Sequence, residues 1–262
     1  MQDTAVRLPY NEGQHMQTSA SLQIRQLAKL EEFSEAVRLQ KEIWGFQDID
    51  LLPLRLFVVA SKIGGQALGA FDGSKMVAFC LCIPGLKPGG RSYLHSHMMG
   101  VLPEYRNGGL GRRLKWRQRE HALAAGVDLI EWTFDPLETK NAFFNIERLG
   151  VIVRRYVHNQ YGRTSSHLHG GLPTDRLIAE WWLNSDRVLA RSAGASPISG
   201  DWQARISVPL NVQELRHRDR QAAMGLQASI AAEFEQCFSA GLAVTAFENT
   251  SDAGVYLLGE WK

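Results

Sequence analysis

The chain has 262 residues, of which 45% are hydrophobic and 21% are charged, a composition typical of a globular protein with a full core. Its 29 basic and 27 acidic residues nearly cancel, which excludes the strongly basic surface of a typical nucleic-acid-binding protein. Three cysteines and the lack of a long apolar run argue against a disulfide framework and a membrane span, so we expect a reduced, cytoplasmic location.

Residues 1–20 are polar and aperiodic, which predicts a loose tail. Beyond them, the spacing of apolar residues predicts strands and helices in mixed order. The elements expected first are a strand at 21–25, helices at 30–44 and 53–63, a hairpin at 66–84 and a strand at 93–101. Asp72 and Gly73 supply the hairpin turn.

The second half continues the alternation and then changes in composition. The elements expected next are a helix at 110–126, a strand at 128–134, a helix at 139–149 and strands at 151–156 and 177–183. Residues 184–203 are rich in small residues without a period, which predicts a linker between a main domain at 21–183 and a piece at 204–262. This β-α-β-β piece is too small for an independent enzyme, so we expect it to extend the main sheet, cover an edge or contact a second copy.

A glycine-rich join connects the strand at 93–101 to the following helix. It reads RNGGLG from Arg106 to Gly111, and glycines at the start of a helix let backbone N–H groups approach a phosphate closely. A P-loop and a dinucleotide fingerprint are both excluded by the spacing, since Leu114 stands at the third glycine position. The join therefore predicts a seat for a phosphate or pyrophosphate. The basic residues that follow are expected to form a solvated helix face, although a phosphate nearby would favour contact with one or two of them: Arg112, Arg113, Lys115, Arg117 and Arg119.

The pattern R-x-x-G-x-G in this setting resembles motif A of the GNAT N-acetyltransferases. Residues 128–151, DLIEWTFDPLETKNAFFNIERLGV, are similar to the family's fifth strand and motif B helix, and the resemblance covers about residues 22–183. The phrases LHSHMMGVLPEYR and WTFDPL resemble a bacterial branch of predicted GNAT acetyltransferases. The resemblance implies an α/β GNAT fold, in which flanking helices cover a mixed twisted sheet that splays between strands four and five, here with a C-terminal extension.

The resemblance also implies that the join binds acetyl-CoA or another short acyl-CoA. Loop amides would hold the pyrophosphate, and backbone groups around Gly100, where a bulge is expected, would pair with the pantetheine arm. The residues expected to contact this co-substrate are Met99, Gly100, Val101, Arg106, Asn107, Gly108, Gly109, Leu110, Gly111, Arg112 and Asn141.

His95 and His97 stand two residues apart on the strand, so both side chains are expected on one face of the sheet. Arylalkylamine acetyltransferases of the family carry an H-x-H pair at this place, which implies that one of the two histidines deprotonates the amine. The residues leave open which of them does so. Glu131 on the next strand is a second candidate base.

The general acid is harder to assign. The position of the family's motif B tyrosine is occupied by Ile146, which carries no proton to give. Tyr156 or Tyr161 could substitute for it, or the thiolate could leave unassisted.

These observations predict transfer of an acetyl group from acetyl-CoA to an amine, by direct attack in a ternary complex. A non-catalytic acyl-CoA-binding module, with a C-terminal surface for a partner or a second copy, is the alternative. A cupin-like metal site formed by the histidines with Cys80 and Cys82 is weaker, because no glutamate follows the pair closely, so no metal is expected. We expect a small amine acceptor and neither a nucleic acid nor a membrane partner. The identity of the acceptor, the acyl chain length and the oligomeric state, including a homodimer, stay open.

Overall fold

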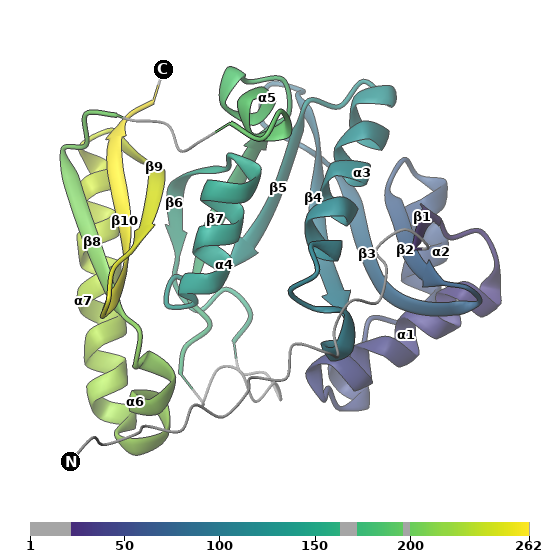
Figure 1. Ribbon diagram of the computed structural model, residues 1–262, viewed down its shortest axis with the longest axis horizontal. Coiled ribbons are helices and arrows are strands. Elements are labelled where there is room, and N and C mark those ends of the chain that lie inside the picture. The colour runs from purple at the N-terminus through teal and green to yellow at the C-terminus, as the bar shows by residue number, and fades with distance from the viewer. Residues whose placement is uncertain (1–21, 163–171, 196–199, 262) are drawn as a thin grey trace, which may run out of the picture.

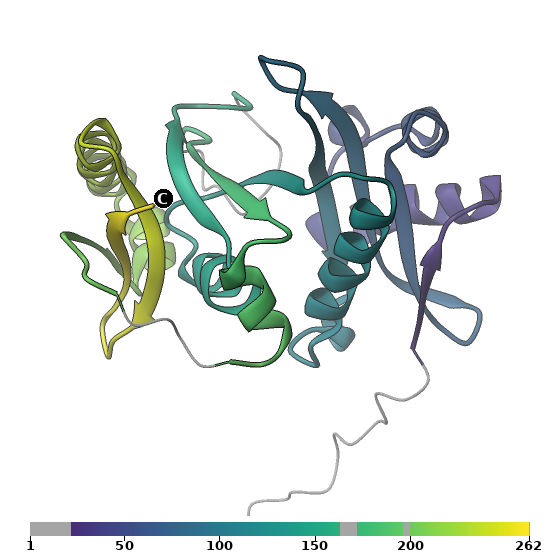
Figure 2. The same cartoon turned by 90° about the horizontal axis from the view of Figure 1, so that it is seen from above.

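One twisted sheet of ten strands runs through the molecule (Figure 1). The computed structural model describes residues 22–162, 172–195 and 200–261, so the tail expected at residues 1–20 lies outside the described residues. The strand order is β1-β2-β3-β4-β5-β7-β6-β9-β10-β8, with helices on both sides of the sheet (Figures 1 and 2). This mixed α/β architecture confirms the predicted fold class.

Most elements begin and end within two residues of the predicted positions. The strands are β1 (Gln23–Gln26), β2 (Gln66–Asp72), β3 (Lys75–Leu86), β4 (Ser92–Val101), β5 (Leu129–Phe134), β6 (Ile152–Val157), β7 (Arg176–Trp182), β8 (Ala204–Pro209), β9 (Leu242–Asn249) and β10 (Ala253–Glu260). The helices are α1 (Leu30–Trp44), α2 (Leu54–Lys62), α3 (Leu110–Ala124), α4 (Thr139–Phe143), α5 (Asp186–Ser192), α6 (Val212–Arg218) and α7 (Arg220–Ser239).

Three helical segments differ from the prediction. The helix expected at 139–149 ends in a π-helical turn, Phe144–Arg148, a feature that often occurs at functional sites. The single helix expected in the β-α-β-β piece is broken at Asp219, whose side chain accepts from the amide of Ala222 and starts α7. The expected linker contains α5, because Ser185 caps a helix that the local composition did not indicate.

Among the described strands, β4 and β5 alone are parallel neighbours. Their register covers two residue pairs and ends at His95 of β4 and Glu131 of β5. Beyond these residues the strands separate (Figure 1). We call the point of separation, between Ser96 and Trp132, the fork. It confirms the splayed sheet that the resemblance implies.

A β-bulge lies beside the fork. Ser96 and Met98 pair with consecutive residues of β3, so His97 is the extra residue of β4. The prediction of a bulge at Gly100 was wrong, because this residue stays in register with β3. Its lack of a side chain has another use, since a Cβ there would lie 2.6 Å from the ring of Trp44. Gly100 thus lets α1 pack closely on β4.

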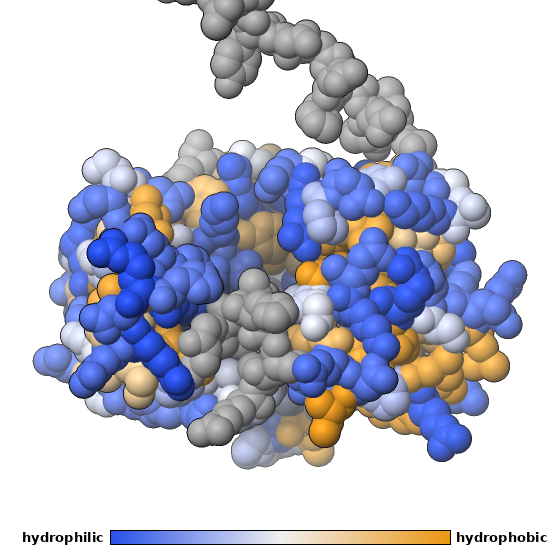
Figure 3. All heavy atoms as spheres, turned by 90° about the horizontal axis from the view of Figure 1, so that it is seen from below, coloured by the Kyte–Doolittle hydropathy of each residue, from blue (hydrophilic) through white to orange (hydrophobic). Residues whose placement is uncertain are grey.

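The two faces of the sheet near β4 are covered by different helices (Figure 2). Helix α3 packs on the face that carries Cys80 and Cys82, where Gln118 contacts both thiols. Helices α1 and α2 pack on the other face, where the rings of Phe57 and Phe79 are 6.0 Å apart. Two large hydrophobic clusters meet along β4, and seen from below, hydrophobic side chains are more prominent on the side of α1 and α2 (Figure 3).

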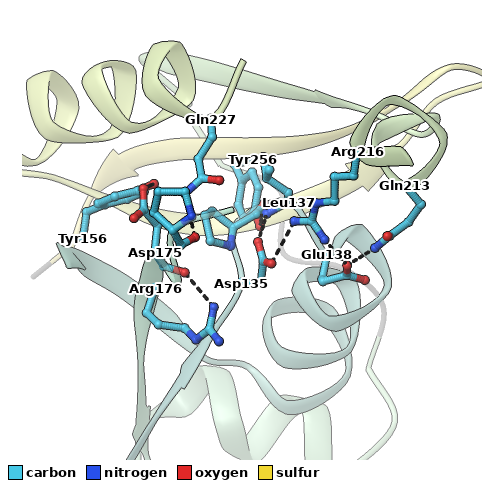
Figure 4. A network of polar contacts seen from close by, with 12 residues as sticks. Asp135, Leu137, Glu138, Tyr156, Asp175, Arg176, Gln213, Arg216, Gln227 and Tyr256 are labelled. Carbon is cyan, nitrogen blue, oxygen red and sulfur yellow. Dashed lines mark hydrogen bonds and ion pairs between the residues drawn. The ribbon is translucent and has the colours of Figure 1, made fainter. Parts of the chain in front are cut away.

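The C-terminal piece continues the sheet, since β9 pairs with β6. Its helix α6 also contacts the turn after β5, where the Arg216 guanidinium lies 2.9 Å from Asp135 and 3.1 Å from Glu138 (Figure 4). The hydroxyl of Tyr256 on β10 donates to the carbonyl of Pro136 in the same turn, at 2.8 Å. Of the three roles expected for this piece, extension of the main sheet is confirmed.

Candidate active site

Helix α3 begins on a backbone that suits an anion. Asn107 and Gly109 have φ angles of 64° and 80°, and glycine adopts this left-handed region without a steric cost. Within the described part of the chain, the amides of residues 107–112 donate to no backbone acceptor. For residues 109–112 the reason is that the start of a helix has no intrahelical acceptors for its first amides. These free N–H groups and the helix dipole favour a negatively charged group at this position.

The space in front of the loop is open. A Cβ built at Gly108 or Gly109 meets no atom within 4 Å, so a ligand can approach the backbone there. Arg106 was expected to contact the co-substrate. Its amide is already engaged, because it donates to the carbonyl of Pro103 at 3.2 Å. Its side chain fixes the loop, because Nε donates to the carbonyl of Val101 at 3.0 Å. The loop therefore fits a pyrophosphate at residues 107–111.

The other residues expected to contact the co-substrate lie on either side of the fork. Residues 99–101 form the end of β4 that has no pairing to β5. Met99 points toward α3, since its Cε would lie 3.6 Å from a Cβ at Gly111. Arg112 donates to the carbonyl of Arg191 at 2.9 Å and so joins α3 to α5. Asn141 is exposed on α4, across the fork from α3 (Figure 1).

His95 and His97 lie side by side, with ring centroids 5.8 Å apart. Desolvation by burial lowers the pKa of His95 to about 4, and the charges of His97 and Lys115 add to this effect. Burial also lowers the pKa of His97. Both imidazoles are therefore neutral near pH 7 and able to accept a proton. Burial lowers the pKa of His95 more than that of His97, so His97 is the better base.

Acidification is expected to destabilise the protein through His95. Its pKa is about 6.5 in an unfolded chain and about 4 in the fold, so the unfolded state binds the proton more readily between these values. The stability that neutral His95 contributes is fully present above about pH 6.5. As the pH falls toward 4, the free energy of unfolding decreases by about 2–3 kcal/mol. Urea unfolding at pH 7 and pH 4.5 measures this loss. The loss of unfolding free energy between the two pH values should be smaller in His95→Gln than in the native protein. It should be unchanged in His217→Gln, which alters an exposed histidine.

Glu131 lies on the strand beside His95, but its carboxylate is engaged. Nζ of Lys87 and Nη2 of Arg155 each lie 2.5 Å from one of its oxygens. These side chains line an open pocket, together with Arg91, Leu129, Arg154, Glu180 and Trp182, and Glu131 in it pairs with His95 across the two strands. The double ion pair suits Glu131 to organising the charges of this pocket better than to accepting a proton.

The two tyrosines considered as acids have different surroundings. Tyr156 donates to Asp175 at 2.7 Å, and burial together with this carboxylate raises the pKa of Tyr156 far above its ordinary value. The hydroxyl of Tyr161 lies 2.9 Å from Oγ1 of Thr133, on the part of β5 beyond the fork. Tyr161 therefore contacts the part of β5 that is separated from β4, whereas Tyr156 is engaged by Asp175. Ile146 is buried in the π-helical turn.

Lys115 is the feature that sequence reasoning missed. It was expected on a solvated helix face, yet its side chain is buried, with 3% exposure, and its Nζ lies at the fork. The spacing of residues could have indicated this burial. Lys115 lies on the same buried face of α3 as Gln118 and Ala122, at intervals of three and four residues. The burial of a lysine at this place makes it a further candidate functional residue.

The cysteines and histidines do not converge. Cys80 and Cys82 face α3, whereas the regular register of β4 directs His95 to the opposite face. The combined metal site considered from the sequence is therefore contradicted by the geometry. Across the described residues, no group of three or more His, Cys, Asp or Glu side chains is arranged to hold a metal ion.

Similarity to known proteins agrees with this geometry. A family model described as "Acetyltransferase (GNAT) family" matches residues 26–150. No protein with a curated description matches the chain. No helix in the described ranges is long and apolar enough to cross a membrane.

Three solved structures illustrate the likeness. The protein smu.2055 from Streptococcus mutans UA159 has a TM-score of 0.51 and 16% identity, over 62% of this chain and 99% of that one. Arabidopsis thaliana NAA60 in complex with a bisubstrate analogue has a TM-score of 0.50 and 13% identity, over 62% and 97%. The protein yncA from Salmonella typhimurium with its cofactor acetyl-CoA has a TM-score of 0.49 and 15% identity, over 63% and 95%. Residues 26–150 thus match the model of the GNAT acetyltransferase family, and the two solved structures with TM-scores of 0.50 and 0.51 share the fold.

Proposed function

We propose that the protein is an N-acyltransferase that uses a short acyl-CoA, with acetyl-CoA as the donor. The observation that carries this proposal is the placement of free backbone amides at the start of α3, at the open end of the fork. The pyrophosphate would lie against residues 107–111, and the arm of the co-substrate along the unpaired edge of β4 at residues 99–101.

The acceptor amine would approach from the face of the histidines. His97, directly or through a water molecule, would take the proton from the amine as it attacks the thioester carbonyl, in a ternary complex without a covalent enzyme intermediate. His97 is preferred to His95 because its pKa is less strongly lowered. The three cysteines are free thiols, which suits the reduced cytoplasm that we propose as its location.

Calorimetric titration with acetyl-CoA and, separately, with desulfo-CoA tests the co-substrate, with a metal chelator present throughout. Micromolar binding of both compounds is expected, because the main anchor is the pyrophosphate. A screen of amines for release of CoA thiol then tests turnover. Binding of neither compound would overturn the proposal.

Gly111→Glu is expected to weaken acetyl-CoA binding at least about 100-fold, through like-charge repulsion at the pyrophosphate seat. A glutamate in the first turn of α3 favours the helix itself, so the fold should persist. Gly111→Gln has nearly the same size without the charge and is the matched control. The difference in dissociation constant between Glu and Gln at this position, measured at two salt concentrations, isolates the charge. Equal affinity of the native protein and Gly111→Glu would contradict an anion at this loop.

A non-catalytic acyl-CoA-binding module is the second candidate. Ile146 and the engagement of Tyr156 by Asp175 favour it, because neither position offers an acid for the thiolate. Tight binding of acetyl-CoA without thiol release, across amines that include amino acids, small polyamines and peptide N-termini, would support this candidate over the enzyme.

A further inference from the structure

The ammonium of Lys115 occupies a polar cage at the fork. Its Nζ donates to Oγ of Ser96 at 2.8 Å and to Oε1 of Gln118 at 3.1 Å. It also lies 3.7 Å from the centroid of the Trp132 ring, which is a cation–π contact. Ser96 and Trp132 are the first residues of β4 and β5 beyond their last pair. The ammonium is therefore held where the two strands separate.

No carboxylate balances this buried charge within the described ranges, because the contacts of Lys115 are a hydroxyl, an amide and an aromatic ring. Cys80 and Cys82 are near, but burial raises the pKa of the Cys80 thiol to about 11 and that of Cys82 still further, so both stay protonated. Burial lowers the pKa of Lys115 to about 8. A buried cation without a counter-ion is costly, and an apolar side chain of similar volume would stabilise the fold better. Such a residue in a cleft is a candidate for function.

The following step rests on the proposed function. An acyl-CoA bound with its pyrophosphate at the start of α3 would have its sulfur at the fork. The pyrophosphate seat lies after the C-terminal end of β4, at residues 107–111. An arm that runs back along the unpaired edge of β4 from Val101 reaches Ser96 at the fork. The thioester is the far end of this arm, so it meets the hydroxyl that Lys115 contacts.

We propose that Lys115, acting through Ser96, stabilises the departing CoA thiolate and supplies its proton. The amine nitrogen forms the new C–N bond, the C–S bond breaks, and its electron pair stays on sulfur. The Ser96 hydroxyl gives its proton to sulfur and takes one from Nζ, which leaves Lys115 neutral. The proton that the amine loses goes to His97, and exchange with solvent restores both groups. Ser96 contacts the sulfur, and Lys115 is a positioning residue behind it.

The experiment titrates the thiol of bound CoA by the ultraviolet absorbance of its thiolate, with the desulfo-CoA complex as the blank. At pH 7 to 7.5, below the pKa of Lys115 of about 8, the thiolate fraction of bound CoA is expected to exceed that of free CoA at least about tenfold. This corresponds to a thiol pKa lowered by about one unit while Lys115 is charged, because a nearby cation favours the thiolate. Lys115→Met should abolish this shift. Lys140→Met, which alters an exposed lysine of α4, should preserve it. The same thiol pKa in the native and Lys115→Met complexes would overturn the inference.

A failure of the inference differs visibly from a failure of the proposed function. If the native protein does not bind CoA, the function is wrong; if it binds CoA without the Lys115-dependent shift, only the role of Lys115 is wrong. The melting temperature of Lys115→Met at pH 7 should equal or exceed that of the native protein, because the unpaired charge is gone. Ser96→Ala keeps the lysine and tests the relay independently: turnover should fall at least about tenfold with unchanged CoA affinity. Undiminished turnover in Ser96→Ala would exclude the relay.

Discussion

Replacing Arg216 with methionine is expected to lower the free energy of unfolding by about 3–5 kcal/mol. The guanidinium of Arg216 is 2% exposed and contacts Asp135, which is 13% exposed, and Glu138. Methionine fills much of the volume but leaves these carboxylates without their shared cation (Figure 4). Urea denaturation at pH 7, followed by circular dichroism, measures the loss.

The control is Arg218→Met on the same helix. Its guanidinium is 77% exposed and pairs with the exposed Glu214, so the change should stay within about 0.5 kcal/mol. Adding Asp135→Asn and Glu138→Gln to Arg216→Met should recover part of the stability, because the repulsion between two carboxylates that no longer share the Arg216 cation disappears. Equal losses in Arg216→Met and Arg218→Met would show that this contact does not hold the C-terminal piece to the domain.

His97→Gln is expected to lower kcat by about 10²–10⁴-fold with the amine that the screen identifies. Glutamine keeps a polar side chain at the bulge but cannot take a proton from the attacking amine. The dissociation constant of acetyl-CoA should change less than about twofold, since the proposed pyrophosphate seat lies on another element. Steady-state thiol release and calorimetry measure the two quantities.

The pH profile adds a second criterion for His97. Because burial lowers the pKa of His97, kcat/KM in the native enzyme should stay high below pH 6.5 and decline only as the pH falls through the lowered value. His95→Gln should leave this acidic limb in place and lower kcat less, whereas His97→Gln should remove it. Native turnover in His97→Gln would rule this residue out as the base.

Local patterns were sufficient to predict most of the fold. The spacing of apolar residues located the strands and the main helices, and Asp72-Gly73 located a turn that the structure confirms, with Gly73 at a φ of 58°. The glycine-rich loop before α3, where we propose the anion site, could also be located from sequence, because its glycines and the following helix are contiguous. The separation of β4 and β5 was known only through resemblance, since strand pairing is not local.

The parts that sequence did not indicate depend on contacts between distant segments. The bulge at His97 follows from the register with β3, and the burial of Lys115 follows from the packing of α3 on the sheet. Helix α5 was hidden in a stretch of small residues, although Arg187 within it donates to the carbonyl of Gly150, 37 residues away. The composition of this stretch predicted a linker, because composition carries no information about such contacts between distant segments.

The short ladder between β4 and β5 has a mechanical consequence. Two backbone residue pairs of the sheet join the half of the molecule with α1 and α2 to the half with α4, together with side-chain contacts such as the Lys87–Glu131 ion pair. Helix α3 contacts both halves through Leu114 and Ala122. The two halves can therefore rotate slightly about α3 at little cost in backbone hydrogen bonds. A molecule bound in the fork would contact both halves. Its binding should therefore slow amide hydrogen exchange in the half with α1 and α2 and also in the half with α4.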